Sequence, residues 1–229
     1  MKFLVGIFFI FLTSTAFSVD TTITGGEMEL RDKGETVFFK GGVHLRRGND
    51  TMKSQEMSTN KNRDQVTAVG HVQLFRKVSS TENWKGKGDQ AYYETQNASG
   101  YLLSYEKRAS LRRTEILSST MTRVVDMFAK RFDFFKNNQF ATANGHVYGK
   151  TIDSQSRSGY EFWSNKAEYD GGSKIITLSG WPFPKLVQKD AEKTSTLVGE
   201  NILYNVETQK LVSKGNAMAV FTDLGEKKK

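Results

Sequence analysis

Apolar and polar residues alternate along several short stretches of this chain, and most of these stretches contain a glycine. The clearest stretch is VTAVGHVQL at 66–74, in which apolar residues occupy every second position and mostly polar residues fill the others. Because successive side chains of a β-strand point to opposite faces, this pattern predicts a strand with one apolar and one polar face. Gly70 lies on the apolar face, where a missing side chain indicates a bend or a close approach of another backbone.

The same phrase recurs along the chain as apolar, any, apolar, any, Gly, polar, apolar. Its five visible copies place their glycines at Gly41, Gly70, Gly145, Gly180 and Gly215. The spacings are 29, 75, 35 and 35 residues, so the longest gap predicts one hidden copy near its middle. The segment 103–111 fits the frame with Lys107 in the glycine position. A fixed period of this kind is typical of a repeat array.

A second phrase precedes most of the anchor glycines, and it predicts the other strand of each repeat. Ala91-Tyr92-Tyr93-Glu94 and Ala167-Glu168-Tyr169-Asp170 are two copies, and turn residues such as those at 170–173 follow. Each repeat therefore reads as a strand, a turn and a longer strand. About six such repeats predict an all-β chain folded as an open β-jellyroll (β-taco-like), with an apolar inside and a polar outside.

The segment 118–138 allows a second interpretation. Met121, Val124, Val125 and Phe128 have helical spacing, and a serine precedes them as a possible cap. The repeat frame requires a pair of strands here, and we prefer that interpretation.

The N-terminus predicts a secretory signal peptide at 1–18. A lysine at position 2 precedes ten apolar residues at 3–12, and small residues follow at 16–18. A membrane span needs roughly 20 apolar residues, so we expect cleavage near Ser18 rather than anchoring. The remaining chain is expected to form a single domain at 19–222 with a basic tail at 223–229, and to be soluble and periplasmic.

Composition removes several classes of chemistry. The chain has 229 residues, no cysteine and three histidines, which excludes disulfides, thiolate zinc sites and cysteine nucleophiles. His71 and His146 share one repeat position, but no further ligand type accompanies them, so we expect no metal. There is no Gly-x-Ser-x-Gly motif and no nucleotide motif. We therefore expect no catalytic residues, no enzyme activity and no cofactor.

The net charge of +8 invites a nucleic-acid interpretation. The densest clusters are Arg46-Arg47, Arg112-Arg113 and Lys227-Lys228-Lys229. A secreted chain meets little nucleic acid, and arginine and lysine suit phosphate groups in general. We expect no nucleic-acid partner, and solvated faces remain the simplest interpretation of the clusters.

The repeated phrases together with the signal peptide resemble the LptA/OstA family of periplasmic lipopolysaccharide-transport proteins, over about residues 23–220. The resemblance implies a V-shaped β-jellyroll whose copies join head to tail through edge strands. It also implies lipopolysaccharide as cargo, with its acyl chains in an apolar groove, and β-jellyroll transport proteins at the inner and outer membranes as partners. Lys107 in a glycine position and the Trp181-Pro182-Phe183-Pro184 stretch depart from the pattern.

The alternation selects the inner face, and the resemblance implies that this face binds lipid. The predicted groove-lining residues are Val37, Phe39, Val43, Leu45, Val66, Ala68, Val72, Leu74, Ala141, Ala143, Val147, Ile176, Leu178 and Leu211. The expected function is to carry or bridge lipopolysaccharide from the inner to the outer membrane during outer-membrane assembly. Two alternatives stay open: a structural envelope β-roll without lipid cargo, and the anchored partner of the same pathway.

Overall fold

The computed structural model describes residues 21–94, 96, 99–135, 139–154, 159–190, 193–205, 208 and 210–223. The predicted signal peptide and nearly all of the predicted basic tail lie outside these residues. Within them the chain is all-β, as the alternation predicts, with one short 3-10 turn, η1 (Asp32–Gly34). No helix among the described residues is long and apolar enough to cross a membrane.

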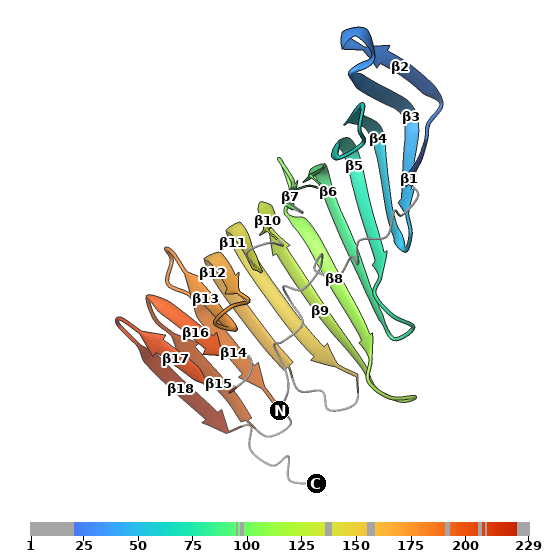
Figure 1. Ribbon diagram of the computed structural model, residues 1–229. Coiled ribbons are helices and arrows are strands. Elements are labelled where there is room, and N and C mark those ends of the chain that lie inside the picture. Colours follow the sequence, from blue (N-terminus) through green and yellow to red (C-terminus); the bar gives the residue numbers. More distant parts are fainter. Residues whose placement is uncertain are drawn as a thin grey trace.

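The strands form two arms that share six long strands (Figure 1). The shared strands are β3 (Thr36–Arg47), β4 (Asp50–Asn60), β5 (Gln65–Lys77), β6 (Glu82–Glu94), β11 (Phe140–Asp153) and β12 (Gly159–Asp170). The first arm adds β2 (Glu27–Arg31), β7 (Ser99–Leu103), β10 (Arg131–Phe135), β13 (Ile175–Ser179), β16 (Asn201–Asn205) and β17 (Leu211–Lys214). The second arm adds β1 (Thr21–Thr24), β8 (Ala109–Ile116), β9 (Thr122–Ala129), β14 (Lys185–Lys189), β15 (Lys193–Val198) and β18 (Met218–Asp223).

All the strand pairs are antiparallel, and their order follows the chain from one end of the roll to the other (Figure 1). The first arm runs β2-β3-β4-β5-β6-β7-β10-β11-β12-β13-β16-β17. The second runs β1-β3-β4-β5-β6-β8-β9-β11-β12-β14-β15-β18. Each arm therefore contains twelve of the strands described.

The line where the arms meet, which we call the crease, is built by the predicted glycines. All five anchor glycines have positive φ, between +65° and +101°. In four of the phrases the next residue also has positive φ: Gly42 has φ of 78°, and His71, His146 and Asn216 have φ of 49°, 50° and 43°. Glycine adopts this region freely, and Asn and His adopt it more readily than most residues. This explains why a polar residue follows the glycine in the repeated phrase.

Each anchor glycine also faces the residue fifteen positions earlier. Gly70 lies against Gln55 (70 − 55 = 15), and the same offset pairs Gly145 with Lys130 and Gly180 with Asn165. A Cβ on Gly180 would lie 2.8 Å from the Cβ of Asn165, which real Cβ atoms do not tolerate. The glycines therefore allow both the left-handed backbone and the close approach of a neighbouring strand.

The hidden repeat is present, but its predicted details are wrong. The prediction put Lys107 in the glycine position of one continuous strand, whereas the segment 104–108 separates β7 from β8. The fifteen-residue offset assigns the anchor to Ser104, whose hydroxyl donates to Asp89 (104 − 89 = 15). Because serine does not favour the left-handed turn that glycine makes, the strand breaks here and resumes at Ala109.

Two other local predictions are confirmed. The segment 118–138 contains β9 and β10 rather than a helix, as the repeat frame requires. The stretch 181–184 interrupts the ladder between β13 and β14, as its two prolines predict.

Side chains from both arms form one hydrophobic core between them. The cluster runs from Val43 near one end of the roll to Ile202 near the other. Contacts cross from arm to arm: the backbone of Gly86 in the second arm lies against Leu102 of the first. The apolar interior therefore extends along the axis of the roll.

The inner face as candidate binding site

Thirteen of the fourteen predicted groove residues are buried or half-buried. Ten are buried, namely Val43, Leu45, Val66, Ala68, Val72, Ala141, Ala143, Val147, Ile176 and Leu178. Val37, Phe39 and Leu74 are half-buried, and Phe39 and Leu74 pack against the core. Leu211 is 38% exposed because it lies on the terminal strand β17.

Sequence reasoning missed several inner-face residues. They are Met57, Trp84, Ala91, Leu102, Ala109, Val125, Met127, Ala129, Phe162, Ala167, Leu186 and Ile202. Many lie on strands without the glycine phrase, so no anchor fixed their register. The period of two within each strand was the available signal: Val125, Met127 and Ala129 alternate along β9.

Aromatic side chains line the inner face of the first arm at the strand ends farthest from the crease. Tyr93 on β6 packs against Phe134 on β10, with their ring centroids 6.4 Å apart. Tyr169 is fully buried, and Tyr204 is half-buried against the core. Burial raises the pKa values of Tyr93 and Tyr204 above the ordinary value. The inner face at these strand ends of the first arm is therefore lined by aromatic side chains.

At the corresponding strand ends of the second arm, the inner face carries charged side chains. Arg47, Asp50, Arg76, Trp84 and Arg113 are successive cross-strand partners in one row. Each lies two positions along its strand from an inner-face residue, as Arg47 does from Leu45, so the row faces inward. We call this row and its three further partners, Glu82, Glu115 and Arg123, the rim cluster.

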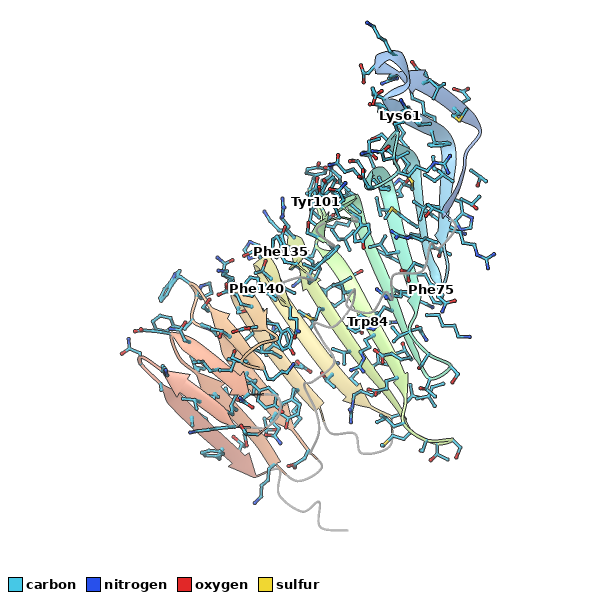
Figure 2. All side chains as sticks on the ribbon, viewed as in Figure 1. Lys61, Phe75, Trp84, Tyr101, Phe135 and Phe140 are labelled. Atoms are coloured by element: carbon cyan, nitrogen blue, oxygen red, sulfur yellow. The ribbon has the colours of Figure 1, made fainter. Side chains whose placement is uncertain are left out.

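The two halves of the rim cluster differ in how well their charges are paired. Arg113 Nε lies 2.8 Å from Glu82 Oε1, and its Nη2 lies 3.3 Å from Glu115 Oε2. Trp84 (labelled in Figure 2) is 4% exposed and donates its Nε1–H to the same Glu82 oxygen at 2.9 Å. In the other half of the cluster, Arg76 Nε lies 3.4 Å from Asp50 Oδ1, which is a longer separation.

Asp50 is the one acidic residue in the row, and it lies between two arginines. Burial raises the pKa of its carboxyl above the ordinary value, against the opposing charges of Arg76 and Arg47. Arg47 and Arg76 also act to lower the pKa of the Tyr93 hydroxyl, against the larger effect of burial, which raises it.

Each of the two arginine pairs predicted as basic clusters is divided between the faces. Arg46 points outward and is exposed, whereas Arg47 points inward. Arg112 on the outer face binds Asp126 through Nε and Nη2, at 2.6 and 2.9 Å, and Arg113 points inward. Neither pair forms one solvated patch, because neighbouring residues of a strand face opposite sides.

The histidines give no support to a metal site. His71 and His146 lie on the crease and are exposed. Across the described part of the chain, no group of three or more His, Asp and Glu side chains could hold a metal ion.

The apolar inner face emerges at both ends of the roll. Met28 and Leu30 on β2 continue the rows of Phe39 and Val37 and are more than 60% exposed. At the other end Phe221 on β18 continues the inner row of the second arm and is 78% exposed. The apolar inner face is therefore buried along the middle of the roll and exposed on these terminal strands.

These features define the class of protein as an open, all-β roll with a continuous apolar interior. Residues 22–121 match a family model described as LptA/(LptD N-terminal domain) LPS transport protein. Over these residues the match bears out the resemblance to the LptA/OstA lipopolysaccharide-transport family that the repeats indicate.

A search of curated proteins finds no match to this chain. Among solved structures, the chain aligns with the crystal structure of LptH, the LptA homologous periplasmic component of the conserved lipopolysaccharide transport device from Pseudomonas aeruginosa. The identity is 12%, the alignment covers 88% of this chain and 94% of that chain, and the TM-score is 0.24.

Proposed function

We propose that this protein is a periplasmic, non-enzymatic carrier that binds the acyl chains of lipopolysaccharide between its two arms. The observation that carries the proposal is the apolar inner face, which runs from β2 to β17 and β18 and is exposed at both ends. The predicted signal peptide supports export, and the family match over 22–121 supports lipopolysaccharide as the cargo.

The energetics suit a carrier that needs no nucleotide. Moving an acyl chain from water into an apolar interior gains about 0.8 kcal/mol per methylene. Moving it there from a bilayer gains almost nothing, because both environments are apolar. The chain can therefore pass on its cargo without overcoming a large binding energy, and the work of transport must come from elsewhere.

We further propose that copies, or related rolls, join head to tail through the terminal strands. An arm of twelve alternating strands ends in a strand that runs opposite to its first strand, so a following roll adds antiparallel at both joints. The charges also match: β2 carries Glu27 and Glu29, whereas Lys210 and Lys214 flank the free edge of β17. Such pairing is a form of strand addition and gives open chains rather than closed dimers.

Site-specific photocrosslinking to lipopolysaccharide tests the cargo. The crosslinker replaces Phe39 or Tyr93 on the inner face, and the controls replace the adjacent residues of identical type, Phe38 and Tyr92, on the outer face. We expect adducts from the inner positions only. Equal labelling from both members of each pair, or none from the inner members, would reject the proposed site.

The second candidate is a structural envelope β-roll without lipid cargo. It is favoured by the burial of ten predicted groove residues, since a sealed core needs no ligand. The same crosslinking decides between the two functions. A protein that assembles into chains but gives no inner-face adduct is the structural roll.

A further inference from the structure

The rim cluster places charged side chains on an inner face that is otherwise apolar. Its four inward arginines are Arg47, Arg76, Arg113 and Arg123, and its carboxylates are Asp50, Glu82 and Glu115. The side chains of Arg76, Arg113 and Arg123 are only 12–16% exposed. Arginine is seldom buried to this extent unless it is paired, so the placement requires a reason.

The excess positive charge gathers at one place in the cluster. Arg113 and Arg123 share Glu82 and Glu115, which balances two cations with two anions. Arg47 and Arg76 flank the single carboxylate of Asp50, which leaves one positive charge in excess.

Directly below this point the surface is apolar. Leu45, Met52 and Leu74 lie two positions along the same three strands and belong to or pack against the core. A molecule whose hydrocarbon part enters between the arms here brings its polar part beside Arg47 and Arg76. Guanidinium groups bind phosphate through paired, charge-assisted hydrogen bonds.

We propose that Arg47 and Arg76 form a site for the phosphate of a phosphorylated acyl amphiphile whose hydrocarbon part occupies the roll. The inference rests on the proposed function and adds to it the place and chemistry of headgroup recognition. Charge complementarity and the apolar surface beneath the site together select an anionic amphiphile over a neutral one.

The test compares binding of two probes by fluorescence titration of the mature chain: bisphosphorylated lipid A and the same glycolipid with its phosphates removed. We expect R47Q/R76Q to weaken binding of the phosphorylated probe at least about tenfold, as charge-assisted bonds are lost, and to leave the dephosphorylated probe unchanged. The control R46Q/K77Q removes the same charge from the adjacent outward positions and should change neither affinity.

Asp50→Asn gives a result that misfolding cannot imitate. Removing this carboxylate takes away the negative charge between the two arginines, so the phosphorylated probe should bind several-fold more tightly. Inorganic phosphate should fail to displace the phosphorylated probe at a concentration at which unlabelled lipid A displaces it.

Four outcomes overturn the inference while the proposed function stands. They are equal binding of both probes by the unaltered chain, equal loss of both probes in R47Q/R76Q, no gain in Asp50→Asn, and displacement by inorganic phosphate as efficient as by lipid A. If the unaltered chain binds neither probe, the proposed function itself fails.

Discussion

Val72 and Gln73 are neighbours on β5, and the same substitution should affect them very differently. Val72 is 1% exposed and faces the core, whereas Gln73 is exposed on the outer face. Val72→Ala removes two methyl groups, which costs about 1.6 kcal/mol in lost transfer free energy, and the resulting cavity adds on the order of 1 kcal/mol. Gln73→Ala should change stability by no more than about 0.5 kcal/mol.

Aspartate at the same two positions should increase the contrast. At position 72 a buried carboxyl without a partner raises its pKa by up to about 3–5 units, at about 1.36 kcal/mol per unit, which approaches the whole stability of a typical domain. At position 73 the new carboxylate lies between Lys53 and Lys87 on the flanking strands. Such cross-strand pairs stabilise a sheet by about 0.2–1 kcal/mol, so Gln73→Asp should be neutral or slightly stabilising.

Urea unfolding of the mature chain, followed by tryptophan fluorescence, measures these differences. Thermal unfolding should shift by about 5–10 °C for Val72→Ala, at about 2–4 °C per kcal/mol for a domain of this size. Similar losses at both positions, or a larger loss at Gln73, would refute the assignment of the faces.

Three further predictions concern the crease and the ends. Gly180→Ala should lower the free energy of unfolding in urea by about 1–3 kcal/mol, and by more than Gly34→Ala does. Both glycines have positive φ, but only Gly180 is crowded by a neighbouring residue. Equal losses of stability would exclude crowding as a cause. The pKa of Asp89 is lowered by hydrogen bonds from Ser104 and the Tyr105 backbone, so the stability that Asp89 contributes is present above pH 3.8 and lost as the pH falls through the lowered pKa. Asp89→Asn should therefore be less stable than the parent chain near pH 7 and converge with it in acid, and a constant difference across pH would contradict this. Ending the chain at Val206 removes β17 and β18 and should abolish concentration-dependent oligomers in analytical ultracentrifugation while the remaining repeats stay folded; oligomers that persist would place the contact elsewhere.

The sequence predicts most of the crease, because glycine is the residue that a left-handed turn requires. Each glycine of the repeated phrase has the positive φ that this role implies. At Ser104 the prediction failed by three residues, since the offset that identifies it joins two strands and cannot be read from one phrase. The alternation also predicted the inner face where an anchor fixed the register.

The rim cluster was missed because charge was taken as a mark of the outer face. Arg47 and Arg76 continue the inward alternation beyond Leu45 and Leu74, so the period of two already placed them inside. The charge of these arginines suggested the outer face, whereas their place in the alternation predicted the inner face. The prediction from the alternation was correct. The effect of Arg47 and Arg76 on the pKa of Tyr93 could not be predicted, because it depends on how the two arms close.

The even number of strands in each arm has a consequence for how such a protein can change in length. The 35 residues from Gly180 to Gly215 supply β14 and β15 to the second arm and β16 and β17 to the first. Duplicating one whole unit therefore lengthens the roll by two strand spacings, about 10 Å, and leaves the direction of both terminal strands unchanged. Inserting a single strand into one arm reverses the direction of its terminal strand. That strand would then pair with the next roll in parallel rather than antiparallel. Gene duplication can thus adjust the span of this fold in steps of about 10 Å without redesigning either end.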